Sequence, residues 1–174
     1  MRLLIPSHLA FGTKGFGSGS SSTVNTRIAG NQCLDYYIHS VSDEKAYDDK
    51  VLADYLVANS LTGYQKTTSG VYYKVIIPGT GTIPITDNTT VYINYVGYLL
   101  NGFLFDSYTL SDGIGTNFDV PAVVPGLQEM LKKFTKGASV STFIPSRLAY
   151  GRAGTGAIPP NSNIRFDFVV VSNN

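Results

Sequence analysis

Apolar and polar residues alternate over several stretches of the second half of the chain, as they do in half-buried strands. Val91, Ile93 and Tyr95 fall on one face of such a strand, and the residues between them fall on the other. Further strands are predicted over residues 70–77, 139–144 and 163–171. The pair Asn101–Gly102 lies between two strand patterns and predicts a two-residue type I′ hairpin turn. The pattern as a whole favours an antiparallel sheet.

One strong helix is predicted inside this region. It begins at Pro125, a favourable first-turn position, and its apolar stripe is followed by lysines and Gly137. The stripe has helical spacing and consists of Leu127, Met130, Leu131 and Phe134. Because a sheet needs an apolar element to cover its face, residues 69–174 are predicted to form an α+β domain, an antiparallel sheet curled around one short helix.

A second helix is predicted over residues 42–60, with Ser42 as a candidate cap and Tyr47, Val51 and Tyr55 recurring every fourth residue. We interpret residues 42–68 as this connector helix followed by a loop.

Composition excludes several functions. The 174 residues carry 13 Lys and Arg against 12 Asp and Glu, so the net charge of +1 disfavours nucleic-acid binding. The lone Cys33 excludes an intrachain disulfide, and the isolated His8 and His39 do not suggest a metal or cofactor site. No stretch has the length and apolar character of a membrane span. The low charged fraction of 14% is weakly typical of extracytoplasmic bacterial proteins.

Candidate chemistry is confined to a few polar groups near apolar strand ends. Tyr95 ends one strand and Phe105–Asp106 the next, and neither segment carries a nucleophile, a metal cluster or a phosphate loop. Such a site suits a change of shape in a substrate rather than a change of bonds.

Seven motifs in this order resemble those of FKBP-type peptidyl-prolyl cis/trans isomerases, and they span most of residues 69–174. They are 91–97 (VYINYVG), 100–107 (LNGFLFDS), 123–127 (VVPGL), 144–145 (IP), 148–151 (LAYG), 158–161 (IPPN) and 166–167 (FD). The resemblance implies a pocket that admits a proline ring between the sheet and the helix.

The resemblance also implies a role for each matching residue. Asp106 and Tyr150 would be catalytic groups at the polar rim, Leu127 the pocket floor, and Ala157 and Ile158 the tip of an overhanging loop. Tyr95, Phe105, Val123, Val124 and Phe166 would line the pocket. On composition alone, each apolar residue could equally be core, Asp106 a turn residue and Tyr150 an ordinary half-buried tyrosine.

Three departures from the family pattern imply modest turnover and weak binding of macrolide inhibitors. Leu127 stands where many members have Trp, and Thr116 stands where an aromatic residue often does. No Arg occurs between Tyr108 and Asn117 to pair with the aspartate.

The function implied is isomerisation of X–Pro bonds in unfolded or nascent polypeptides, without a cofactor, in the periplasm or associated with the outer membrane of a bacterium. A dry apolar pocket would penalise the charge-separated planar amide relative to the twisted transition state. Two alternatives stay open: a chaperone-like binding module with little catalysis, and a tandem-repeat scaffold with a blocked pocket.

Residues 5–12 (IPSHLAFG) partly repeat residues 144–151 (IPSRLAYG). Residues 1–41 therefore resemble the closing third of a second FKBP-like domain, with Leu34–Asp35 matching Phe166–Asp167. Three explanations compete: a tandem two-domain protein of which this chain is a part, self-association through the incomplete unit, or packing of that unit against the intact domain.

Overall fold

The structure is a computed structural model that describes residues 2–10, 13, 31–37, 40–109 and 115–173. It divides into two compact units, Met1–Ser42 and Asp43–Asn174. Each unit is described by itself.

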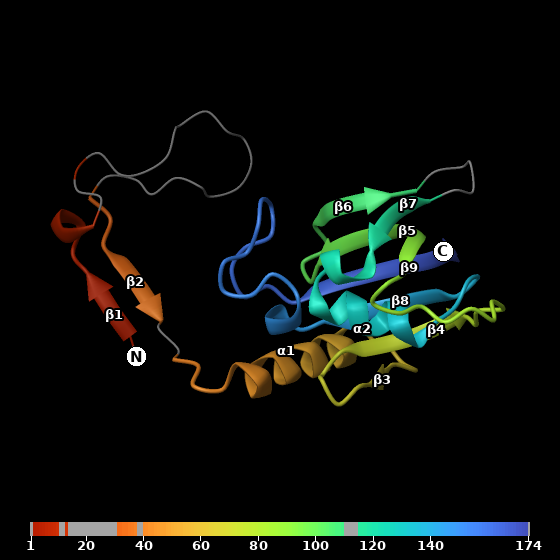
Figure 1. Ribbon diagram of the computed structural model, residues 1–174. Coiled ribbons are helices and arrows are strands. Elements are labelled where there is room, and N and C mark those ends of the chain that lie inside the picture. Colours follow the sequence, from red (N-terminus) through yellow and green to blue (C-terminus); the bar gives the residue numbers. More distant parts are fainter. Residues whose placement is uncertain (1, 11–12, 14–30, 38–39, 110–114, 174) are drawn as a thin grey trace. The chain divides into compact units, whose positions relative to one another are not determined.

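The larger unit contains a sheet of seven strands in the order β3-β4-β8-β9-β5-β6, with β7 also paired to β5 (Figure 1). All pairings are antiparallel. β6 and β7 pair with successive parts of the same edge of β5, at residues 95–98 and 90–93. The strands are β3 (Gln65–Lys66), β4 (Tyr72–Ile77), β5 (Thr90–Leu99), β6 (Leu104–Tyr108), β7 (Thr116–Asp119), β8 (Ser139–Ile144) and β9 (Ile164–Asn173).

Helices cover both faces of this sheet. Helix α2 (Pro125–Lys133) packs with Val140 and Ile144 of β8 in the main apolar core. Phe143 of the same strand points the other way and packs against α1 (Glu44–Ala58), whose Leu52 is fully buried. The predicted α+β class, an antiparallel sheet around one short helix, is confirmed, and α1 adds a layer on the opposite face.

The alternation predicted for the central strands matches their burial. Along β5, every second residue from Val91 to Gly97 is buried, and Val91 and Ile93 are fully inaccessible. In β9, the inward positions Ile164, Phe166, Phe168 and Val170 are likewise buried. These two central strands pair with each other, and both contribute residues to the wall of the candidate site.

Helix α2 is shorter than predicted but lies close to the sheet. It ends at Lys133, and Phe134 adopts extended backbone as its C-cap while its side chain still packs against the core. The close approach depends on Gly126, because a Cβ placed there would lie 2.3 Å from Cγ2 of the fully buried Ile144. Leu127 follows and is thereby held against the sheet.

The hairpin between β5 and β6 exists, but the predicted type I′ turn is wrong. Gly102 has a positive φ of 86°, whereas Asn101 does not. The N–H of Gly102 donates to the carbonyl of Leu99 at 2.9 Å, and the N–H of Leu99 donates to the carbonyl of Phe103 at 2.9 Å. These bonds fit a type I turn followed by a glycine in left-handed conformation, the longer hairpin loop.

Helix α1 buries a different stripe from the one that the sequence predicted. Asp43, not Ser42, caps it, because its side chain accepts the N–H of Ala46 at 2.9 Å. The buried residues are Asp48, Leu52 and Leu56, one position beyond the predicted tyrosine stripe, and Tyr47 is exposed.

The outer strand β4 is irregular. Its pairing with β8 shifts register between Val75 and Ile77, and Pro78 follows directly. The neighbouring strand β3 covers only two of its residues. Val75, Ile76 and Ile77 are exposed.

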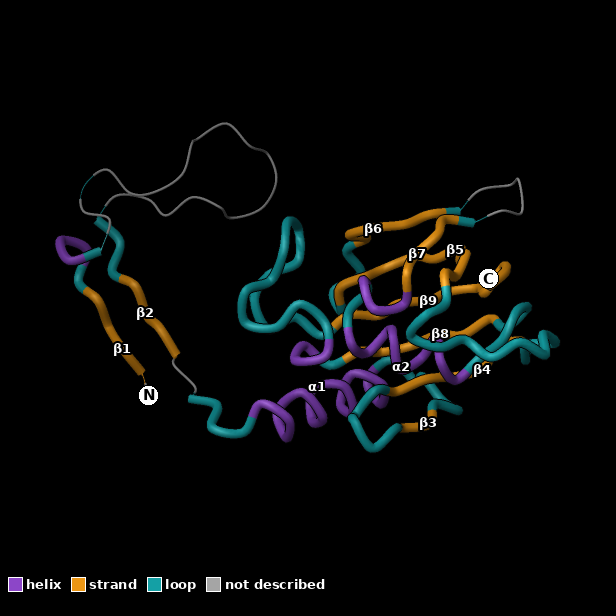
Figure 2. The backbone as a smooth tube through the Cα atoms, in the orientation of Figure 1, coloured by secondary structure: helices purple, strands orange, loops and turns teal. Residues whose placement is uncertain are grey.

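The smaller unit holds an antiparallel pair, β1 (Arg2–Ile5) and β2 (Leu34–Tyr37), with a short 3₁₀ turn, η1 (Ser7–Leu9), after β1 (Figure 2). Strand β2 ends at Tyr37, and residues 38–39 lie outside the described part.

This pair repeats the backbone of the β8–η3–β9 segment, where η3 spans Ser146–Leu148. The residue that ends the 3₁₀ turn has φ and ψ of −106° and −107° at Ala10, and −113° and −114° at Ala149. Asn31 and Asn161, each three residues before the second strand, both have positive φ, 63° and 56°.

The register corrects the alignment of the two repeats. Ile5 faces Leu34 as Ile144 faces Ile164. Leu34 therefore corresponds to Ile164, and the expected match of Leu34 with Phe166 is wrong by two residues. Tyr36 is the counterpart of Phe166.

Candidate functional site

A cleft of about 180 Å³ opens between α2 and the concave face of the sheet. Strands β5, β6, β7 and β9 contribute to its wall, together with the segment before α2 and the segment after η3. Its lining is mostly apolar and aromatic and consists of Tyr95, Asp106, Phe118, Ala122, Val123, Val124, Leu127, Tyr150, Ile164 and Phe166.

The aromatic wall is built across neighbouring strands. The ring of Tyr95 on β5 stacks on that of Phe166 on β9, with centroids 4.9 Å apart and an interplanar angle of 16°. Phe118 on β7 also packs against Tyr95, with centroids 5.7 Å apart and an interplanar angle of 60°. Tyr95 and Phe166 are both more than nine-tenths buried, so their rings are held by packing and form an apolar wall below the rim.

The rim carries three polar groups. The hydroxyl of Tyr95 donates to Oδ2 of Asp106 at 2.8 Å, which fixes the carboxylate at the mouth of the cleft. Tyr150 lies within electrostatic reach of the same carboxylate. Its ring meets that of Phe105 edge-on at 6.5 Å and 83°.

Both phenols are held in the protonated form. Burial, and then the hydrogen bond to Asp106, raise the pKa of Tyr95. Burial, and then the charge of Asp106, raise the pKa of Tyr150. Tyr150 therefore remains a hydrogen-bond donor at physiological pH.

Seven of the ten residues that the sequence predicted for the site line this one cleft: Tyr95, Asp106, Val123, Val124, Leu127, Tyr150 and Phe166. Tyr95 and Phe166 share one concavity, as the pocket interpretation requires.

The other three predicted residues lie outside the lining. The Phe105 ring covers Gly97, where an added Cβ would lie 2.5 Å from Cζ of the ring, and it contacts the lining through its edge-on packing with Tyr150. Ile158 is buried within the main core, and Ala157 is exposed.

Phe118, Ala122 and Ile164 line the cleft but were missed as site residues. Phe118 is the one aromatic residue in β7, between the polar Asn117 and Asp119, and this alternation could have marked it as inward-facing. In the structure it pairs with Val91, a buried residue of β5. It lies two residues beyond Thr116, where the family pattern led us to look for an aromatic residue. The other two lie beside predicted lining residues, Ala122 in sequence and Ile164 on the inward face of β9.

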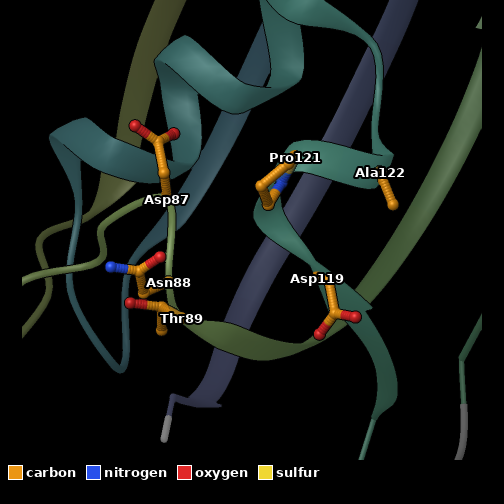
Figure 3. A pocket seen from close by; sticks show the side chains of 6 residues that line it. All are labelled: Asp87, Asn88, Thr89, Asp119, Pro121 and Ala122. Carbon is orange, nitrogen blue, oxygen red and sulfur yellow. The ribbon is translucent and has the colours of Figure 1, made fainter.

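A second hollow of about 510 Å³ adjoins the first, and Ala122 lines both. Figure 3 shows Asp119, Pro121 and Ala122 on one side of it and Asp87, Asn88 and Thr89 on the other. Its two carboxylates already have partners: Asp87 pairs with Lys132 at 2.6 Å, and Asp119 accepts the hydroxyl of Thr90 at 2.7 Å.

Among the described residues, no group of three His, Cys, Asp or Glu side chains could hold a metal ion. In the same part of the chain, no helix is long and apolar enough to cross a membrane.

A curled antiparallel sheet over one short helix, with an aromatic cleft and a phenol and carboxylate rim, defines the class of FKBP-type domains. Residues 81–171 match the family model of FKBP-type peptidyl-prolyl cis-trans isomerases, which is more than half of the chain. The chain belongs to this family.

Relatives of this family are similar in sequence. The chain is 42% identical over 106 residues to the FKBP-type peptidyl-prolyl cis-trans isomerase FkpA of Escherichia coli K12, covering 60% of this chain and 38% of that protein. It is 38% identical over 133 residues to the outer membrane protein MIP of Legionella longbeachae, covering 75% and 56%. The chain thus spans about two fifths to just over half of these relatives.

Solved structures show the same fold. The crystal structure of FkpA from Escherichia coli superposes with a TM-score of 0.64 and 33% identity, covering 75% of this chain and 61% of that one. A peptidyl-prolyl cis-trans isomerase from Pseudomonas syringae pv. tomato superposes with a TM-score of 0.62 and 26% identity, covering 78% and 99%.

Proposed function

We propose that residues 69–174 form a peptidyl-prolyl cis/trans isomerase domain that accelerates rotation about X–Pro bonds in unfolded or nascent polypeptides. The observation that carries the proposal is the aromatic cleft, in which the stacked pair of Tyr95 and Phe166 meets a rim with Tyr150 as a donor. The proline ring would enter this cleft, with Leu127 as its floor.

The mechanism follows from the polarity of the amide. Rotation about the C–N bond has a barrier of about 18–20 kcal/mol because amide resonance separates charge in the planar form. Withdrawal of water from the bond penalises the planar form more than the twisted one. The buried faces of Tyr95 and Phe166 supply this dry surface, so no covalent step is required.

Tyr150 and Asp106 act at the rim. The protonated phenol of Tyr150 donates to a substrate carbonyl and holds the residue before proline while the bond twists. Asp106 is held in place by the hydroxyl of Tyr95. Its negative charge orients the phenol of Tyr150 and acts electrostatically on the substrate carbonyl.

A protease-coupled proline-peptide assay on the whole chain tests the proposal. Tyr150→Phe and Asp106→Val are each expected to lower kcat/KM about tenfold, which is less than the roughly 10²–10⁴-fold typical of a general acid or base because neither group transfers a proton here. Tyr47→Phe, an exposed tyrosine on α1, is the matched control and leaves kcat/KM unchanged. Unchanged kcat/KM in both rim variants would contradict the catalytic roles proposed for Tyr150 and Asp106.

The same cleft supports a second function, holding unfolded chains with little turnover. Absence of isomerase activity in the wild-type chain, together with suppression of aggregation of a denatured client, would favour this chaperone-like role. Blocking the cleft with Val124→Trp would then abolish the suppression if the cleft binds the client.

We also propose that residues 1–41 are the closing part of a second FKBP-like unit, with residues 42–68 as the connecting segment. The matched dihedral angles at Ala10 and Ala149 and the shared register support this proposal. Among the described residues of this unit, residues 3–5 and 34–37 pair only with the facing strand, which makes self-association through the pair an additional proposal. Light scattering of the whole chain tests it, and a strictly monomeric species contradicts it.

The location proposed is the periplasm or the outer membrane of a bacterium. It rests on the relatives, one of which is called an outer membrane protein. Fractionation of the source cells, followed by immunodetection of the chain, tests it.

A further inference from the structure

A buried carboxylate on the back of the sheet contacts the segment that carries Tyr150. Asp48 of α1 is only 2% exposed, and both of its carboxylate oxygens lie 3.0 Å from the hydroxyl of Ser146, which donates to them. The backbone N–H of Arg147 also donates to Oδ2, at 3.4 Å. Ser146 begins the 3₁₀ turn η3 that follows β8.

Ser146 in turn holds the backbone on both sides of Tyr150. Its carbonyl oxygen accepts the N–H of Ala149 at 3.0 Å and the N–H of Gly151 at 2.9 Å. Its own N–H donates to Oδ1 of the buried Asn163 at 2.7 Å. The two residues that flank Tyr150 are therefore tied to one atom of Ser146, and Ser146 is tied to α1 through Asp48.

A carboxylate at position 48 has no advantage for packing. The next buried positions of the helix, one and two turns on, are Leu52 and Leu56, so an apolar residue would continue the stripe. Burial of a charged group costs free energy unless hydrogen bonds compensate for it. The compensation comes from the one turn that leads to Tyr150.

From these contacts we infer that Asp48 is a positioning residue for Tyr150, acting from α1 through Ser146 on the rim of the cleft. The inference rests on the proposed isomerase function for its effect on turnover, but the position of Tyr150 can be measured without it. A second contact between the same two segments, the ion pair of Glu44 with Arg152, is exposed and contributes little.

The experiment compares Asp48→Asn with Asp54→Asn in the whole chain. Both replace an aspartate of α1 with its neutral isostere, but Asp54 is exposed and pairs with Lys50 within the helix. Asp48→Asn is expected to lower kcat/KM by about threefold to tenfold, less than the hundredfold that a misplacement of about 1 Å can cost. Asp54→Asn is expected to leave it unchanged.

A double-mutant cycle distinguishes positioning from general destabilisation. In the Tyr150→Phe background, Asp48→Asn is expected to cause no further loss of kcat/KM, because the group that it positions has gone. Equal losses in the two backgrounds would overturn the inference.

The titration of Tyr150 gives a readout that does not depend on activity. With ¹³C-labelled tyrosine, the Tyr150 resonance is assigned as the one missing in Tyr150→Phe. Burial and Asp106 raise its pKa, so a Tyr150 freed from its position is expected to titrate nearer its ordinary value in Asp48→Asn but not in Asp54→Asn. An unchanged pKa would overturn the inference, even if the wild-type chain proves inactive and the proposed function fails. If Asp48→Asn does not fold, Ser146→Ala takes its place in both measurements, with the same outcomes.

Discussion

Gly126 offers a test of the packing that sets the floor of the cleft. A Gly→Ala change inside an exposed helix usually stabilises a protein by about 1 kcal/mol, because glycine is the poorer helix former. At Gly126 we expect the opposite sign. The new Cβ would lie 2.3 Å from Cγ2 of Ile144, an inner methyl group of a fully buried, branched side chain that cannot rotate away.

The expected magnitude follows from two opposing effects. Overpacking of a core costs about 1–3 kcal/mol, and the gain in helix propensity offsets about 1 kcal/mol, so Gly126→Ala should lower the free energy of unfolding by about 1 kcal/mol. Because Leu127 is the next residue, the shift of α2 should also change the cleft and raise KM.

The chain has no tryptophan, so urea unfolding is followed by near-ultraviolet circular dichroism of its 12 tyrosines. The control is the double variant with Ile144→Ala, which removes the clashing methyl group. We expect the two changes to be less than additive by about 1–2 kcal/mol, as for residues in contact. A more stable Gly126→Ala variant would refute the close approach of α2 to β8.

Three further predictions concern the rim and the segment that precedes α2. Tyr95→Phe should lower the free energy of unfolding by about 1 kcal/mol, since it removes a hydrogen bond to a carboxylate that is exposed enough to regain water; an unchanged urea midpoint would contradict this. The raised pKa values of Tyr95 and Tyr150 mean that folding favours their protonated forms, so stability is fully present below about pH 10 and should fall as pH rises above it. Thermal melts between pH 8 and pH 11 test this, and Tyr95→Phe should show the smaller fall. Gln128→Ala should raise KM more than it lowers kcat, because the amide of Gln128 donates to the carbonyl of Val123 at 2.7 Å and fixes that part of the cleft wall; an unchanged KM would show that this tether is dispensable.

The central strands could be predicted from sequence because their burial follows directly from alternation. Val91, Ile93 and Tyr95 of β5 needed no knowledge of their partners. The hairpin was also found, but its turn type was not, because the Asn–Gly pair is compatible with both the two-residue and the longer loop and only the backbone angles decide.

The buried face of α1 could not be predicted in this way. Periodicity favoured the tyrosines, whose rings are amphipathic, whereas the structure buries Asp48 because Ser146, 98 residues away, supplies its hydrogen bond. Contacts of this kind leave no local signal.

The site was predicted to the extent that the family motifs specify it. Tyr95, Asp106 and Tyr150 came together as the resemblance implied, and their catalytic roles stay predictions. Ile158 shows where prediction from motifs fails, because it matches a family motif but is buried in the main core instead of lining the cleft.

The irregular outer strand bears on how this molecule behaves when concentrated. A long, flat and hydrophobic edge strand can pair with the same strand of other molecules and so cause aggregation. The register shift between Val75 and Ile77 increases the local twist of β4, and Pro78 lacks the backbone N–H that a further strand would need. The edge of β4 is therefore not a regular template for pairing with another molecule. We accordingly expect β4 to be a poor template for strand addition although Val75, Ile76 and Ile77 are exposed.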